Sequence, residues 1–287
     1  MSAPPRVSVL IPTLQAEPWL DGLLRALAAQ RVGGGSELVV VDSDSTDRTR
    51  ELVTAAGGRL ERIPRTEFGH GRTRNRLAER ARGELLVFLS QDALPEGEDF
   101  LARLVGPLAE EDVAGATARL LPREDDDPLT TRTALDAPEA SAEPRVWGPA
   151  DLGSDTVHFN DVASAVRAEV LRALPFPDVA FGEDVLWAEG ALRAGWRLAF
   201  VPGAVARHAH AYGPAQAYRR YRTDAAFHRE RGVRLRPGLA SVLRGIGHEL
   251  RADWGHVARR RRGWVHLLRA PALRTAQVLG QWAGSRR

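Results

Sequence analysis

Short apolar runs that end in polar residues constrain the fold of this chain more than any other feature. The clearest are Val7–Pro12, Glu37–Asp42 and Leu85–Leu89. Each run has the length of a strand that is buried on both faces. Segments with apolar residues at helical spacing lie between the runs, as in Trp19–Gln30 and Arg72–Arg82. This alternation predicts an α/β fold in which helices flank a Rossmann-like, mainly parallel sheet.

The alternation continues beyond the third run, with one interruption. We expect strands at Val113–Leu121, Asp161–Arg167 and Arg197–Val201. Residues 122–156 contain three consecutive aspartates, several prolines and no periodicity. Segments of this length and composition inside a domain are usually surface loops, so we expect a long loop here.

The C-terminal part of the chain differs from the rest in charge and in pattern. We expect one domain over residues 1–212 and a basic helical extension over residues 213–287. The formal net charge of +3 hides this division, because eighteen arginines face four acids from Arg207 onward. That segment carries +14, and residues 1–206 carry −11.

A basic amphipathic helix is typical of attachment to an anionic membrane surface. The alternative is a helical cap that packs on the core and exposes its arginines. We do not expect nucleic-acid binding, since the chain lacks an aromatic stacking platform among its basic residues.

Several classes of protein are excluded by what the sequence lacks. It has no cysteine, which rules out disulfides, thiolate metal sites and a cysteine nucleophile. No apolar stretch has the length of a membrane-spanning helix or of a signal-peptide core. We therefore expect a cytoplasmic protein, attached peripherally to the inner face of the membrane if the basic extension binds lipid.

Polar residues follow three of the predicted strands. They are Pro12-Thr13, Asp42-Ser43-Asp44-Ser45 and Ser90-Gln91-Asp92. Ligands of open α/β sheets bind at the carboxyl ends of the strands. A carboxylate there can bond a base or ribose, and a second can hold Mg²⁺ or Mn²⁺ against a diphosphate. A Walker loop and a Gly-x-Gly-x-x-Gly turn are both absent, which argues against a P-loop NTPase and a dinucleotide oxidoreductase. The alternative is that these residues only cap helices and solubilise loops.

Five motifs occur in a characteristic order. They are Val-Ser-Val-Leu-Ile-Pro-Thr (7–13), Val-Val-Val-Asp-Ser-Asp-Ser-Thr-Asp-Arg-Thr (39–49), Phe-Gly-His-Gly-Arg-Thr-Arg-Asn (68–75), Phe-Leu-Ser-Gln-Asp-Ala (88–93) and Gly-Glu-Asp (182–184). Together they resemble glycosyltransferase family 2, which has the GT-A fold, over about residues 6–212. The third and fourth motifs look most similar to its bacterial rhamnosyltransferase-type branch.

The resemblance implies roles for residues on the donor side of a nucleotide-sugar site. Pro12, Thr13 and Asp42 would line the base and ribose pocket. Arg74 would face the nucleotide or its phosphates. His70 would contact a phosphate or would only close the turn before its helix.

The resemblance also implies a metal site. Ser90-Gln91-Asp92 stands where the family has an Asp-x-Asp motif, so Gln91 and Asp92 would lie at the donor diphosphate. Ser90 replaces the first aspartate, which leaves Asp92 as the one carboxylate ligand of this motif. His208 or His210 falls where some members place a further metal ligand, and their spacing puts both rings on one face of a strand. We expect Mn²⁺ or Mg²⁺ as the cofactor.

The Glu183-Asp184 pair would supply the catalytic carboxylates, with Asp184 as the general base. The alternative is that both acids only stabilise the first turn of a helix, where the helix dipole favours negative charge. The function implied is inverting transfer of a sugar from a nucleotide-diphosphate donor to a glycan, glycolipid or lipid-linked acceptor. The branch suggests dTDP-rhamnose as the donor and cell-envelope polysaccharide as the product.

Two other functions stay open at this point. One is a catalytically silent nucleotide-sugar-binding or membrane-scaffold protein, which Ser90 favours and the Glu183-Asp184 pair opposes. The other is a sugar nucleotidyltransferase, which would need a glycine-rich basic loop where Leu14–Glu17 stands.

Overall fold

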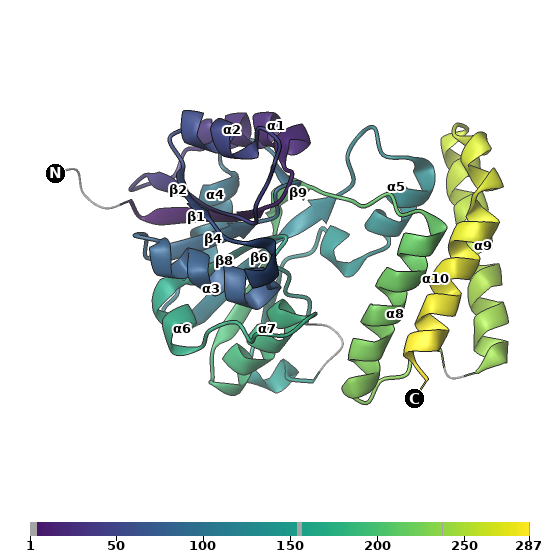
Figure 1. The fold of residues 1–287 in the computed structure, drawn as a ribbon. Coiled ribbons are helices and arrows are strands. Elements are labelled where there is room, and N and C mark those ends of the chain that lie inside the picture. The colour runs from purple at the N-terminus through teal and green to yellow at the C-terminus, as the bar shows by residue number, and fades with distance from the viewer. Residues whose placement is uncertain (1–4, 154–156, 237, 287) are drawn as a thin grey trace. The chain divides into compact units, whose positions relative to one another are not determined.

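The chain forms two compact units in the computed structural model (Figure 1). The structure describes residues 5–153, 157–236 and 238–286. The first unit comprises Met1–Leu121 and Pro138–His208, and the second comprises Pro122–Ala137 and Ala209–Arg287. Residues 122–137 therefore make their contacts with the C-terminal helices, although 71 residues of the first unit follow them in the sequence. The domain boundary predicted at residue 212 stays a prediction.

A nine-stranded sheet forms the centre of the first unit, as far as the described residues show. The strands are β1 (Val7–Thr13), β2 (Ser36–Asp42), β3 (Arg59–Arg62), β4 (Leu85–Leu89), β5 (Leu94–Pro95), β6 (Val113–Leu121), β7 (Arg145–Trp147), β8 (Ala163–Arg167) and β9 (Arg197–Arg207). Their order is β3-β2-β1-β4-β8-β6-β9-β5, and β7 also pairs with β9. The strands β5, β7 and β8 run opposite to the other six. The predicted mainly parallel sheet is confirmed.

Helices cover both faces of this sheet (Figure 1). They are α1 (Glu17–Ala28), α2 (Thr49–Ala55), α3 (His70–Arg80), α4 (Phe100–Val105), α6 (Ala168–Ala173) and α7 (Glu183–Arg193). Successive residues of β1 point to opposite faces, so Val9 and Ile11 pack with the α1 and α4 side while Leu10 packs with the α3 and α7 side. Burial on both faces explains why the strands are continuous apolar runs.

The prediction of a long loop over residues 122–156 is wrong. This segment contains α5 (Pro128–Leu135) and β7, with two short 3₁₀ helices at Pro138–Ala140 and Pro149–Asp151. Trp147 of β7 is 2% exposed and packs in the core beside α7. Residues 154–156 lie outside the described residues.

The second unit is helical. It contains α5, α8 (Pro214–Glu230), α9 (Leu239–Arg260), a 3₁₀ helix at Trp264–Leu268 and α10 (Ala270–Gly284). The helices α8 and α10 approach closely at two glycines of α10. A Cβ on Gly280 would lie 2.5 Å from the Tyr218 carbonyl oxygen, and one on Gly284 would lie 2.2 Å from that of Arg222. The helix α9 ends within the run of four arginines at residues 259–262, so Arg259 and Arg260 lie in its last turn.

Candidate active site

The ends of β1 and β2 are tied together by the carboxylate of Asp42. Pro12 and Thr13 pair in register with Val41 and Asp42. The Thr13 hydroxyl donates to Asp42 Oδ2 at 2.9 Å. Ser45 donates to the same carboxylate through its main-chain N–H (2.9 Å) and its hydroxyl (2.5 Å). Asp42 is fully buried, so in this structure it shapes the loop at the strand ends by accepting protein donors.

The loop after β4 is bonded to the loop after β1. Gln91 Oε1 accepts from the Leu14 N–H at 2.8 Å, and Gln91 Nε2 donates to the Leu14 carbonyl at 3.1 Å. A side-chain amide that bonds both main-chain groups of one residue imitates a strand neighbour. Gln91 thereby fixes the position of Asp92 relative to the ends of β1 and β2.

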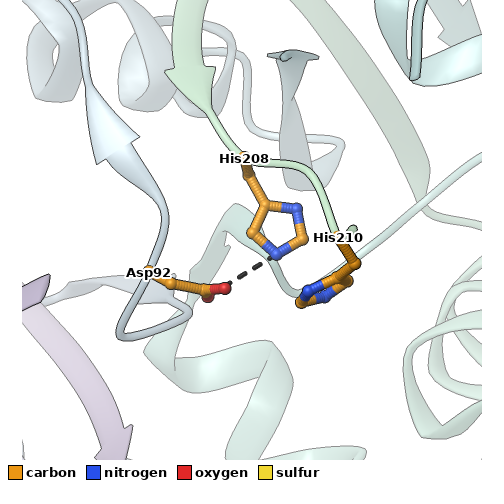
Figure 2. Close-up of side chains that lie close together, drawn as sticks. All are labelled: Asp92, His208 and His210. Atoms are coloured by element: carbon orange, nitrogen blue, oxygen red, sulfur yellow. Dashed lines mark ion pairs between the residues drawn. The ribbon is translucent and has the colours of Figure 1, made fainter. Parts of the chain in front are cut away.

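Asp92, His208 and His210 converge at the same edge of the sheet (Figure 2). The antiparallel pairing of β5 with β9 aligns Leu94 with Arg207. Asp92 precedes Leu94 by two residues and His208 follows Arg207, so this register brings the two side chains together. His208 Nε2 lies 3.5 Å from Asp92 Oδ1. One ligand atom from each of the three side chains lies within 4.8 Å of the other two.

These three side chains form a set that can hold a divalent ion. They offer one carboxylate oxygen and two imidazole nitrogens, which suits Mn²⁺ better than the oxygen-seeking Mg²⁺. Neighbouring ligands of an ion with bonds of about 2.1 Å lie about 3 Å apart, so the side chains would close on it by small rotations. The two imidazoles lie beside Asp92, where Ser90 offers no carboxylate.

A second cluster of charges joins α3 to the start of α7. Arg74 is buried and its Nη1 donates to Glu183 Oε1 at 2.8 Å. Its Nη2 bonds the Asp161 carbonyl oxygen at 3.4 Å, and its Nε lies 3.4 Å from Asp161 Oδ2. His70 is exposed at the first turn of α3, with Nδ1 4.0 Å from Glu183 Oε1. Arg74 and Glu183 are therefore each other's partners.

Asp184 is held differently from Glu183. Its Oδ1 accepts from the main-chain N–H of Val185 at 2.9 Å, and its Oδ2 accepts from that of Asp161 at 3.4 Å. The side chain is partly exposed. Next to Asp161, the Val162 carbonyl accepts from the Ser90 N–H at 2.9 Å. One dipeptide, Asp161-Val162, therefore contacts both the Asp184 carboxylate and the loop that carries Asp92.

The pKa of Asp161 is strongly perturbed. Burial raises its pKa from an ordinary 3.8 to about 7, although the nearby Arg74 guanidinium lowers it. The charges of Asp184 and Glu183 raise it further, whereas the hydroxyl of Ser164, which donates to Asp161 Oδ1 at 2.8 Å, lowers it. Desolvation disfavours the charged form of a buried acid. Asp161 therefore carries a proton over part of the neutral range.

The third motif has a structural explanation. A Cβ on Gly71 would lie 2.2 Å from the Pro177 carbonyl oxygen, so only glycine allows α3 to approach this segment. Asn75 bonds the main chain of Phe176 twice, at 2.8 Å and 3.0 Å. Together with the Arg74–Glu183 pair, these contacts hold the segment that leads into Asp184.

Asp161 is a site residue that the sequence pattern did not predict. The first residue of a parallel strand over Asp161–Arg167 would lie at the edge opposite to the site. Because β8 is antiparallel to β4 and β6, its first residues lie where those strands end. An acid directly before an apolar run was the available signal, but its meaning depends on the strand direction.

Comparison with solved structures identifies the architecture as the GT-A fold of nucleotide-sugar glycosyltransferases. The mannosyltransferase PcManGT from Pyrobaculum calidifontis, solved with GDP-Man and Mn²⁺, has a TM-score of 0.63. The match covers 99% of this chain and 86% of that one at 24% identity. S. aureus TarS has a TM-score of 0.59, covering 95% and 55% of the two chains at 20% identity. At these identities the likeness concerns the fold alone.

The family model for glycosyl transferase family 2 matches residues 8–172, more than half of the sequence. This chain belongs to glycosyltransferase family 2. It is 33% identical over 201 residues to the O-antigen chain rhamnosyltransferase WbaN of Salmonella anatum, covering 67% of this chain and 62% of WbaN. It is 30% identical over 230 residues to RfbN of Salmonella typhimurium, also an O-antigen chain rhamnosyltransferase, covering 78% and 72%. The predicted resemblance to the family and its rhamnosyltransferase-type branch is confirmed.

Proposed function

We propose that this chain transfers a sugar with inversion from a nucleotide-diphosphate donor to a hydroxyl of a glycan, glycolipid or lipid-linked acceptor. The observation that carries the proposal is the convergence of Asp92, His208 and His210 beside the ends of β1, β2 and β4. This edge is where open α/β sheets bind nucleotides. The names of WbaN and RfbN support rhamnose as the sugar and O-antigen-type polysaccharide as the product.

The donor would lie along the ends of the strands. The loops shaped by Asp42 and Gln91 would bind the nucleoside, and Pro12 and Thr13 would contact its nucleobase. The diphosphate would reach Asp92, His208 and His210, which would hold a divalent ion, and His70 would reach the donor from the other side. Arg74 would act through Glu183 and Asp161, since it is buried among them. When bound, the ion would offset the charge that develops on the leaving nucleoside diphosphate.

Asp184 would act on the acceptor. As the acceptor oxygen forms its bond to the anomeric carbon, its proton passes to the Asp184 carboxylate and the bond to the diphosphate oxygen breaks. The main-chain N–H groups of Val185 and Asp161 orient that carboxylate. A single displacement inverts the anomeric centre, through a transition state like that of glycoside hydrolysis. The silent binding protein would have the same donor contacts and no turnover.

The metal site is tested by titration of the purified chain with Mn²⁺, followed by calorimetry with and without dTDP-rhamnose. We expect Asp92→Asn and His208→Gln to weaken Mn²⁺ binding at least about tenfold, because each removes a ligand. The affinity of both variants for dTDP-rhamnose should fall as well. His228→Gln and Asp99→Asn change the same residue types elsewhere and should bind Mn²⁺ like the parent.

Unchanged Mn²⁺ affinity in both site variants would show that these residues hold no ion. Loss of Mn²⁺ binding with an unchanged affinity for dTDP-rhamnose would show that donor binding does not depend on the ion. Release of dTDP from the bound donor distinguishes the enzyme from the silent binding protein, which would release none.

A further inference from the structure

The second unit exposes large apolar side chains on α9 and on the 3₁₀ helix that follows it. We call these residues the tryptophan–leucine face. They are Leu239, Leu243, Trp254, Trp264, Val265 and Leu268, with between 48% and 83% of each residue exposed. Among the described residues of this unit, such side chains elsewhere are scattered, as at Leu135 and Val233. Large apolar side chains exposed together along one helix and the turn after it indicate an interaction surface.

The face follows from the geometry of α9. Leu243, Gly247 and Trp254 fall within about 40° of one another around a helix that turns about 100° per residue. All three are exposed, whereas Val242 and Asp253, which lie roughly 100–120° away around the helix, are buried. One side of α9 therefore packs inside the unit, while an outward stripe next to it exposes Leu243 and Trp254.

The 3₁₀ helix extends this outward stripe. The rings of Trp254 and Trp264 meet edge to face with centroids 6.4 Å apart. Val265 and Leu268 follow Trp264 and are among the most exposed apolar residues in the described chain. The two tryptophans thus join the stripe of α9 to the apolar residues of the turn.

Arginines border the face. Arg244 and Arg251 lie about 20° apart around α9 and about 70° from the middle of the apolar stripe. Both are exposed. At the end of the helix, Gly263 alone separates the exposed run Arg259–Arg262 from Trp264. Exposed aromatic and aliphatic side chains beside guanidinium groups match the layering of a bilayer surface, which has hydrocarbon beneath anionic headgroups.

We propose that the tryptophan–leucine face lies in the plane of an anionic lipid bilayer, with its apolar side chains among the upper acyl chains and its arginines at the phosphates. In the described part of the chain, no helix has the length and apolarity to cross a membrane. The inference is independent of the proposed glycosyl transfer, because lipid binding is measured without donor or acceptor.

The charges argue against other occupants of this face. A second copy of the chain would place its own Arg244, Arg251 and Arg259–Arg262 near these arginines. Repulsion between the like charges opposes such a contact. Nucleic acid would match the arginines but not the aliphatic residues Leu239, Leu243, Val265 and Leu268. Anionic lipid satisfies both kinds of side chain.

The test is sedimentation of the full chain with vesicles of phosphatidylcholine, alone or mixed with phosphatidylglycerol. We expect binding to the mixed vesicles that weakens as salt screens the arginines. The double variant Leu243→Ser/Trp254→Ser should lower the partition coefficient at least about tenfold, since apolar burial drives insertion. Arg244→Gln/Arg251→Gln should lower it at least about tenfold and flatten the salt dependence.

Arg219→Gln/Arg222→Gln is the matched control, because it removes two exposed arginines from α8 outside the face. It should bind mixed vesicles much more tightly than either face variant. Circular dichroism melting confirms that each variant is folded. The proposal fails if Leu243→Ser/Trp254→Ser partitions like the parent. It also fails if the parent binds no vesicles and instead forms dimers, by analytical ultracentrifugation, that this variant abolishes.

Discussion

The two adjacent acids at the start of α7 have different surroundings, and these surroundings suit them to different tasks. Glu183 is 6% exposed and accepts a charged hydrogen bond from the buried Arg74. Asp184 is more accessible and accepts two main-chain bonds, one of them as long as 3.4 Å. A carboxylate oxygen with unused acceptor capacity can take a proton from a bound hydroxyl. Asp184 is thus suited to act as the base, and Glu183 to position the helix that carries it.

Asp184→Asn should lower kcat by about 10²–10⁴-fold, the usual contribution of a general base. Donor affinity should change far less, because the base acts when the acceptor attacks. Asn also suits the first turn of a helix, so a purely capping role predicts near-parental activity. Turnover is measured as release of nucleoside diphosphate, and affinity by calorimetry.

Asp178→Asn, a change at an exposed acid, is the control and should behave like the parent. Glu183→Gln should lower the melting temperature together with activity, since it weakens the hydrogen bond that Arg74 donates to this side chain. A folded Asp184→Asn variant that binds donor and turns over at the parental rate would remove Asp184 from the mechanism.

At the scale of helices and strands, the sequence predicted what depends on local pattern. Leu85–Leu89 and Val113–Leu121 form strands with the predicted limits, and the strand ends bring Thr13 and Asp42 together. Strand direction depends on distant pairing, so the antiparallel β8, and with it Asp161, could not be placed.

The helix α5 was missed for a different reason. Asp127 caps it by accepting from the Leu129 and Thr130 N–H groups, and Pro128 occupies its first turn. This Asp-Pro start is a recognisable helix signal. However, the buried side chains of α5 include Thr130, Thr131 and Arg132, so the helix shows no apolar periodicity.

Arg132 belongs to a buried ion cluster that joins α5, α9 and α10. Asp253 is fully buried and accepts from Arg132 Nε at 2.6 Å. It also accepts from Arg274 Nε and Nη2, both at 2.8 Å. Glu249 is a further partner of Arg132. One carboxylate therefore connects three helices of the second unit through two buried cations.

Asp253→Ala should destabilise the second unit strongly. The substitution leaves two buried guanidinium groups without their shared acceptor, and removal of one partner from a buried ion pair costs roughly 3–5 kcal/mol. Urea unfolding monitored by circular dichroism measures the loss. Asp136→Ala removes the exposed partner of Arg132 and should cost about 0–1 kcal/mol. Similar losses in the two variants would contradict the central role of Asp253.

For the molecule as a whole, stability should depend on pH through two opposing groups of acids. Arg80 and then Arg76 lower the pKa of Glu61, although burial opposes them. Burial alone would raise the pKa of Asp127, but hydrogen bonds from Arg269 and Thr130 outweigh it and leave that pKa lowered. Lowered acids stabilise the fold above their unfolded pKa, and this contribution is lost as pH falls. Asp161, with its raised pKa, acts in the opposite direction.

Asp161→Asn should therefore change the pH dependence of unfolding. Between its unfolded pKa of 3.8 and its folded pKa of about 7, Asp161 holds a proton that the unfolded chain has released. Native stability then falls as pH rises through this window and levels off above it. Asn has no charge to desolvate and keeps an oxygen that can accept from Ser164, so the melting temperature of the variant should fall less between about pH 5 and about pH 8. Asp21→Asn, at an acid that is 75% exposed, should follow the parent. Parallel curves for Asp161→Asn and the parent would mean that Arg74 keeps Asp161 ionised in the fold across the whole range.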